Sequence, residues 1–365
     1  MIFLKPNIEK LRKNHNIKGL LKALSYKEAF IRSDAAFTIG QIFEGYNKSP
    51  LKDEASTALV QTLVDSDFNV QETTVYALGH MRQVEPLIEV LNNGEKQLRI
   101  VAAKVMGWNL QNLSVIDALV IALKNDRDEE VRSNAASSLG SIIEDRKRQF
   151  DQYEENYDKK IIDDCCKVLL EALRDTPLVY SNALWALAKS KKNDVIPHLI
   201  KGLGDENGAV RKMAAVGLGM VGSAVGKEGV NSLVRTVQNS NESVETRECA
   251  IRSLGSIQND IALQALHLLH ESPVADKFNT TIDYALGQYP SNKTAVAAKQ
   301  HKQTWQYWAY IHKHGQLQVK EWYQGNTFIQ EAPTSPNVKH FLEEPFEATS
   351  IEEAEEIAAK LLNLN

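Results

Sequence analysis

The sequence predicts an all-α protein, a right-handed α-α superhelix of about eight stacked helix pairs, with a small C-terminal α+β cap. Three observations support this fold class. One line of residues returns eight times along the chain, apolar residues recur at helical spacing between the copies, and an aromatic, alternating stretch follows Pro290. We expect an N-terminal leader at 1–18, a repeat array at 19–300 and a C-terminal segment at 305–365.

The repeated line is clearest at Val131–Ile142, where an arginine is followed by two alanines and a Leu-Gly pair. The arginine position and the last position, which we number 0, are eight residues apart in every copy, and successive copies lie 28 to 48 residues apart. A period of two short helices predicts a solenoid, in which each repeat packs only on its neighbours. The residues at position 0 are Gly40, Gly79, Gly107, Gly140, Ala188, Gly219, Gly255 and Gly287.

A second, amphipathic segment precedes each copy. Its apolar residues recur at three- and four-residue steps, which predicts helix rather than strand. Pro86 and Pro197 fall in the first turn of their segments, where a missing amide is tolerated. The charged stretch 144–160 in the longest interval predicts a lengthened helix or a protruding loop. These first helices are expected at 19–24, 58–64, 84–91, 115–123, 165–173, 195–203, 230–237 and 262–269.

The composition is that of an ordinary soluble protein, with 43% hydrophobic and 24% charged residues. The net charge of −5 resides in 305–365, which has nine glutamates but only four lysines and no arginine. Three cysteines, two of them adjacent at 165 and 166, cannot build a disulfide framework. The start is too short for a signal peptide, and no run is long enough to cross a membrane. We therefore expect a cytoplasmic protein.

The last segment has a different pattern. The aromatic alternation over 305–323, centred on His314-Gly315, predicts a β-hairpin. A third strand is expected at 338–342, and Ser350–Glu353 forms a capping-box pattern that opens a helix. These features predict a β-β-β-α domain or a cap on the last repeat.

The pattern resembles HEAT repeats, and more narrowly the short bacterial and archaeal HEAT-like repeats of the phycobilisome-lyase type. The residues that carry the likeness are Val84–Leu91 (Val-x-Pro-Leu-Ile-x-x-Leu), the linking aspartates, and Val131–Gly140 (Val-Arg-x-x-Ala-Ala-x-x-Leu-Gly). The likeness covers residues 17–290. It implies an α-solenoid, a fold that serves many functions.

The repeated arginines favour an internal role. A ladder of basic side chains could grip phosphates. The resemblance implies instead that each arginine pairs with acidic residues of the links between helices, such as Asp126, Asp128 and Asp205, and we favour this interpretation. The arginines concerned are Arg32, Arg99, Arg132, Arg211 and Arg247.

A candidate partner surface follows from helix geometry. Positions −7, −3 and +1 share one helix face, opposite the small and apolar positions that face the core. The resemblance implies that second helices line the concave surface, where solenoids bind partners. Aromatic residues beside lysine and arginine suit a protein interface; the alternative is that the aromatic rings pack between repeats. The candidates are Phe37, Tyr76, His80, Lys104, Trp108, Trp185, Lys189, Arg252 and Tyr284.

The sequence contains little that resembles a catalytic or metal-binding motif. His267 and His270 lie on one helix, but the di-iron hydroxylases with HEAT-like repeats use several His-Glu pairs, and this chain has only His270-Glu271. His312 and His314 have no cysteine nearby for a zinc site. Cys165-Cys166 matches no redox spacing and is expected on a buried helix. We therefore expect no catalytic residue, metal or cofactor.

The sequence thus favours a non-catalytic scaffold or adaptor that binds a protein partner on its concave face. One alternative, implied by the resemblance, is a bilin-lyase-like or chaperone-like factor acting on a chromophore-bearing protein. Another is a nucleic-acid-binding protein, although the repeat array is charge-neutral and a binder usually shows a basic excess. A deep apolar pocket would favour the first alternative, and a basic concave face the second.

Overall fold

The computed structural model describes residues 5–44, 49–108, 112–153, 156–289, 305–312, 317–321, 338–341, 346–348 and 351–362. The chain divides into two compact units, Met1–Tyr289 and Pro290–Asn365. Unit 1 is an all-α solenoid. The described residues of unit 2 form strands and a helix.

Unit 1 begins with α1 (Ile8–Lys13) and continues in eight helix pairs within the described residues, as the repeat predicts. The first helices of the pairs are α2 (Ile17–Ala23), α4 (Leu51–Thr62), α6 (Val84–Asn93), α8 (Leu113–Asn125), α10 (Asn156–Glu171), α12 (Ile196–Gly202), α14 (Lys227–Gln238) and α16 (Asp260–His270). The second helices are α3 (Ala29–Ile42), α5 (Phe68–His80), α7 (Lys96–Met106), α9 (Glu129–Tyr153), α11 (Pro177–Ala188), α13 (Gly208–Val221), α15 (Val244–Ile257) and α17 (Ala275–Gly287). Three short 3-10 turns, η1 (Ala172–Arg174), η2 (Asn193–Val195) and η3 (Gly222–Ala224), lie beside them.

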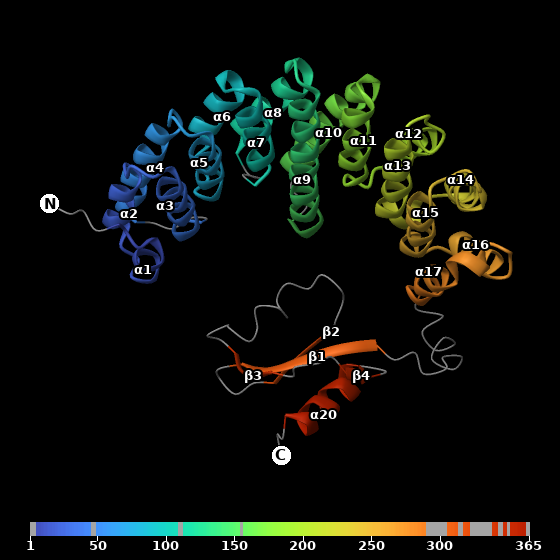
Figure 1. Cartoon of the computed structure of the whole chain (residues 1–365). Helices are drawn as coiled ribbons and strands as arrows, with labels where there is room; N and C mark the ends of the chain where they lie inside the picture. The colour runs from blue at the N-terminus through green and yellow to red at the C-terminus, as the bar shows by residue number, and fades with distance from the viewer. Residues whose placement is uncertain are drawn as a thin grey trace. The chain divides into compact units, whose positions relative to one another are not determined.

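The helices of unit 1 form two rows. Each second helix packs on the second helix of the next repeat, from α3 on α5 to α15 on α17, and on the first helix of its own pair. Figure 1 shows the second helices on the inner side of the curve that unit 1 makes and the first helices on its outer side. We call them the inner row and the outer row.

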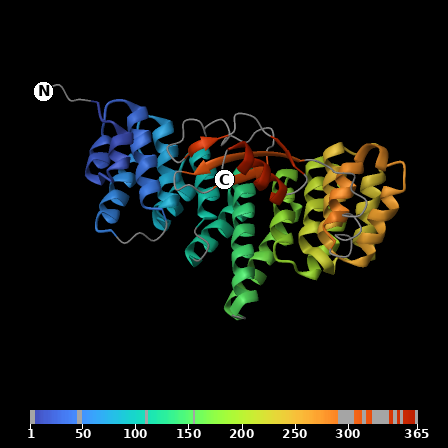
Figure 2. The ribbon, with the colours of Figure 1, turned by 90° about the horizontal axis from the view of Figure 1, so that it is seen from below.

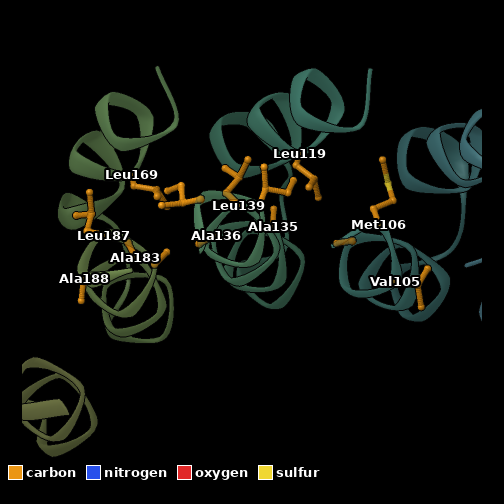
Figure 3. Close-up of a cluster of buried hydrophobic side chains, with 14 of the residues drawn as sticks. Val105, Met106, Leu119, Ala135, Ala136, Leu139, Leu169, Ala183, Leu187 and Ala188 are labelled. Atoms are coloured by element: carbon orange, nitrogen blue, oxygen red, sulfur yellow. The ribbon is translucent and has the colours of Figure 1, made fainter. Parts of the chain in front are cut away.

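The core lies between the two rows. Leu119 of α8, Leu139 of α9 and Leu169 of α10 are fully buried and point into this space (Figure 3). Ala135 and Ala136 let the α9 backbone approach its neighbours (Figure 3). The buried apolar side chains form one continuous cluster from the first to the last repeat, because each pair can bury its apolar face only against the next.

The glycines at position 0 set the spacing of the inner row. A Cβ atom on Gly40 would lie 2.7 Å from the Cα of Ala77, and one on Gly140 would lie 2.8 Å from the Cα of Ala186. In both cases the neighbour stands at position −2 of the next repeat. Glycine is needed here for close approach of two helix backbones, not for an unusual backbone angle.

The described residues of the interval 144–160 are helical. α9 runs for 25 residues to Tyr153 and α10 begins at Asn156, so the insertion lengthens both helices. The end of α9 extends beyond the neighbouring helices of the inner row (Figure 2). Arg146 of α9 and Asp158 of α10 are both buried and form an ion pair of 2.9 Å that joins the two extensions.

Unit 2 contains β1 (Trp305–His312), β2 (Leu317–Glu321), β3 (Val338–Phe341), β4 (Phe346–Ala348) and α20 (Ile351–Leu361). The predicted hairpin region holds β1 and β2, which pair antiparallel, and β3 and β4 pair antiparallel with β1. The sequence predicted three strands. It did not predict the short β4, because an alternation of apolar and polar residues cannot be recognised over only three residues. The right-handed superhelix and the capping role of 305–365 stay predictions.

Candidate partner-binding surface

All nine predicted surface residues lie on the inner row or directly after one of its helices. Phe37, Trp108 and Tyr284 are 45%, 38% and 62% exposed. Lys104 and Arg252 are also exposed, and the other four, Tyr76, His80, Trp185 and Lys189, are half-buried. No candidate belongs to the buried core. Whether these residues bind a partner stays a prediction.

Four of the candidates form one contact group, which we call the aromatic cluster: Tyr76, His80, Lys104 and Trp108. The Tyr76 and Trp108 rings stack with centroids 6.3 Å apart, and the His80 ring lies 5.0 Å from Trp108. The Lys104 Nζ atom lies 5.9 Å from the Tyr76 centroid. The cluster joins α5 to α7 and leaves Trp108 and Lys104 open to solvent.

Trp185 and Lys189 form a second group on α11 and at its C-terminus. The Lys189 Nζ atom lies 4.0 Å from the Trp185 ring and also pairs with the Glu144 carboxylate of the preceding repeat. The remaining three candidates stand apart from both groups. Of these, Arg252 pairs with Glu248 of its own helix at 3.3 Å.

Both tryptophans also pack against the preceding repeat. A Cβ atom on Gly79 would lie 3.2 Å from the Trp108 ring, and one on Gly140 would lie 3.2 Å from the Trp185 ring. The glycine surface therefore seats one part of each indole while another part remains accessible. One part of each indole ring therefore packs between repeats, and another part remains available for a surface contact.

Two carboxylates that the sequence argument did not select complete these groups. The His80 Nδ1 atom lies 3.5 Å from Glu44, and Lys189 pairs with Glu144. Both glutamates stand at position +4 of one repeat, and His80 and Lys189 both stand at position +1 of the next. This shared offset is visible in the sequence and could have predicted the pairs.

The repeated arginines form an internal ladder, as we favoured from the sequence. Arg32 donates two hydrogen bonds of 2.7 Å to Asp65, and Arg132 donates two of 2.7 Å to Asp175. Each arginine also donates to backbone carbonyls of its own link, as Arg132 does to Asp126 O at 2.9 Å. One guanidinium thus ties two successive links together. Two further rungs are Arg99 with Asp126 and Arg211 with Glu242.

Some of the predicted partners were wrong. Asp128 pairs with Lys96 at 2.9 Å rather than with an arginine of the ladder. Asp205 offers only its backbone carbonyl to Arg211, whose carboxylate partner is Glu242 of the next link. The physical reason is direction, because the guanidinium finds its carboxylate partner in the following link and contacts only backbone carbonyls of its own link. Arg247 donates instead to Val237 O at 2.7 Å.

The ladder predicts a pH dependence of stability. Hydrogen bonds from the guanidinium groups hold the pKa values of Asp65, Asp175 and Glu242 below their ordinary values, against the opposing effect of burial. A depressed folded-state pKa contributes stability above the unfolded pKa and loses it as pH falls through the folded pKa. We therefore expect the melting temperature to fall on acidification below about pH 4. Calorimetry of wild type and Asp175→Asn at several pH values should show the difference between them shrinking with acid; a constant difference would contradict this assignment.

Metal and nucleophile candidates do not form sites in the described part of the chain. No group of three or more His, Cys, Asp or Glu residues there could hold a metal ion. His270 pairs with Asp283 at 3.1 Å, and the predicted His314 lies outside the described residues. Cys165 and Cys166 are buried on α10, as expected, and burial raises the pKa of the Cys165 thiol to about 12. Such a thiol is a poor nucleophile.

The described helices include none long and apolar enough to cross a membrane. A shallow cavity of about 310 Å³ opens between α12, α13 and α14, with Ile200 and Leu203 in its wall and the Arg211–Glu242 pair and Arg235 beside them. Its size lies at the lower end of the range for ligand pockets. It is not the deep apolar pocket that a tetrapyrrole would require.

The comparisons with known proteins agree with this architecture. The family model described as HEAT repeats matches residues 84–150 and 166–238. No curated protein matches the sequence. Among solved structures the chain is similar to importin β, at 15% identity and a TM-score of 0.54, over 80% of this chain and 44% of that one. The chain thus spans less than half of importin β, and at this identity the likeness shows the fold alone.

Two further solved structures are similar at lower scores. The complex of CpcE and CpcF of phycocyanin lyase from Nostoc sp. PCC7120 is 16% identical with a TM-score of 0.40, covering 74% of this chain and 96% of that chain. Human deoxyhypusine hydroxylase is 19% identical with a TM-score of 0.32, covering 78% of this chain and 99% of that one.

Proposed function

Because the chain is built of HEAT repeats, we propose that it is a non-catalytic scaffold or adaptor that binds a protein partner along its inner row. The observation that carries this proposal is the aromatic cluster. Its rings stack across two repeats, yet Trp108 remains 38% exposed. Trp, Tyr and Arg are enriched among the hot-spot residues that dominate the binding energy of protein interfaces.

The ladder supports a protein partner over a nucleic acid. Arg32, Arg99, Arg132 and Arg211 each hold a carboxylate of the next link and are mostly withdrawn from solvent. They are therefore not available to neutralise phosphates, which supply most of the affinity of nucleic-acid binders. For the lyase-like alternative, the cavity of about 310 Å³ between α12, α13 and α14 gives no support.

The test is to remove the aromatic rings and measure binding. The tagged wild-type chain would recover a partner from nuclease-treated native lysate, and that partner would then be purified for titration. We expect Tyr76→Ala with Trp108→Ala to weaken its binding at least about tenfold, the effect of losing interface hot spots. Circular dichroism would confirm that the helices are retained.

The control removes exposed apolar side chains from the outer row. Ile121 on α8 and Leu268 on α16 are 56% and 69% exposed, and Ile121→Ala with Leu268→Ala should leave the affinity unchanged. Equal losses in both double variants, or recovery of nucleic acid alone, would exclude the inner row as a protein-binding surface.

A further inference from the structure

The N-terminal end of the inner row combines aromatic rings with negative charge. Phe37 stands at position −3 of α3, the position that Tyr76 occupies on the adjacent α5, so aromatic residues recur at this position in the first two repeats. Adjacent packed helices lie about 10 Å apart, so the surface across α3, α5 and α7 is about 20 Å long. An extended segment of about six residues covers that length.

Carboxylates outnumber cations on this surface. At positions −7, −6, −3, +1 and +4 of the first three repeats, the described residues include Asp34, Glu44 and Glu72 but only one lysine, Lys104. Asp34 is exposed, and the Glu44 side chain is 67% exposed. Within the described part of the chain, Glu44 is approached by His80 at 3.5 Å, and this imidazole is charged only when protonated.

The matching positions farther along the row differ in charge. Lys189 and Lys192 follow the end of α11, and Lys212 lies on α13. Each of these lysines pairs with a carboxylate of a neighbouring helix or loop, for example Lys192 with Asp163 at 3.0 Å and Lys212 with Glu245 at 2.9 Å. Their charge is thus neutralised within the chain. Among the described residues, an excess of carboxylates at these positions beside open aromatic rings occurs on α3, just after it, and on α5.

The rings already accept a cation. Lys104 places its ammonium 5.9 Å from the Tyr76 centroid, within the range of a cation–π contact. A guanidinium can stack on an aromatic face and donate two hydrogen bonds to a carboxylate at the same time. Asp34 on α3, Glu44 just after α3 and Glu72 on α5 offer such carboxylates beside the rings.

We propose that this end of the inner row binds an arginine-bearing segment of the protein partner, with guanidinium groups stacked on the aromatic rings and paired with the surrounding carboxylates. The inference rests on the proposed function and specifies the chemistry of the partner. It assigns the carboxylates Asp34, Glu44 and Glu72 a binding role.

The test uses a dye-labelled Gly-Ser peptide that carries several arginines, titrated against the full chain. We expect Glu44→Gln with Glu72→Gln to weaken the peptide's binding at least about fivefold, since a desolvated cation–π contact and its paired carboxylates act together. The matched control is Glu54→Gln with Glu85→Gln, which removes the same charge from exposed positions on α4 and α6 of the outer row. This control should stay within about twofold of wild type, because distant exposed charges are screened by salt.

Three results would overturn the inference: no binding of the arginine peptide to wild type, an equal loss in both double variants, or equal binding of a peptide with glutamates in place of arginines. A competition experiment distinguishes failure of this inference from failure of the proposed function. If the aromatic variant loses the protein partner but the arginine peptide does not displace that partner, only the inference fails. If the aromatic variant keeps the partner, the proposed function itself fails.

Discussion

Replacing Gly140 by alanine is expected to lower the free energy of unfolding by about 1–3 kcal/mol, the usual cost of overpacking a tight contact. In an isolated helix the same change would stabilise, because alanine is a better helix former than glycine. The sign reverses here because the new Cβ would lie 2.8 Å from both the Cα and the Cβ of Ala186. A backbone atom cannot rotate away, so α11 must move off α9.

Gly287 provides the matched control. It occupies the same position 0 in the last repeat, but a Cβ there would meet nothing within 4 Å among the described residues. Gly287→Ala should therefore be neutral or stabilise by up to about 1 kcal/mol. Urea unfolding followed by circular dichroism would measure both variants. If Gly140→Ala were as stable as Gly287→Ala, position 0 would not set the spacing of the inner row.

The contrast between these glycines explains why the fold was predictable from the sequence. Each repeat must place a small residue where the next helix crosses, so glycine recurs at position 0 and small or apolar residues, such as Ala77 and Ala186, recur at position −2. The period of the pattern therefore gave the number of helix pairs. It could not give β4, because a three-residue strand is specified by its partner β1 and not by its own alternation.

The sequence could predict which positions of each repeat form the candidate surface, but not the contacts among their side chains. Helix periodicity placed Tyr76, Trp108 and Trp185 outside the core, and the structure agrees. Periodicity could not say which side chains meet, because contacts across repeats depend on the offset between adjacent helices. That offset places position +4 of one repeat beside position +1 of the next, which brings Glu44 to His80 and Glu144 to Lys189.

Removal of the Asp126 carboxylate is expected to destabilise unit 1 by about 3 kcal/mol, the cost of breaking a largely buried ion pair from one side. Asp126 accepts hydrogen bonds of 2.9 and 3.0 Å from Arg99 and a third of 2.9 Å from the Asp128 amide. The Arg99 side chain is only 5% exposed. In Asp126→Ala its guanidinium therefore stays buried and has lost its counter-charge.

An exposed pair at the next repeat boundary separates this effect from a general loss of charge. Lys124 of α8 and Glu171 of α10 lie 2.8 Å apart, with side chains 43% and 55% exposed, and Glu171→Ala should have no measurable effect on urea unfolding because exposed pairs contribute little. Adding Arg99→Met to Asp126→Ala should recover part of the lost stability, since no buried charge then remains.

Because each repeat packs only on its neighbours, breaking one rung should also weaken the coupling between the two sides of the array. Asp126→Ala is therefore expected to broaden the unfolding transition, and a single sharp transition at unchanged urea concentration would show that the ladder does not join the repeats.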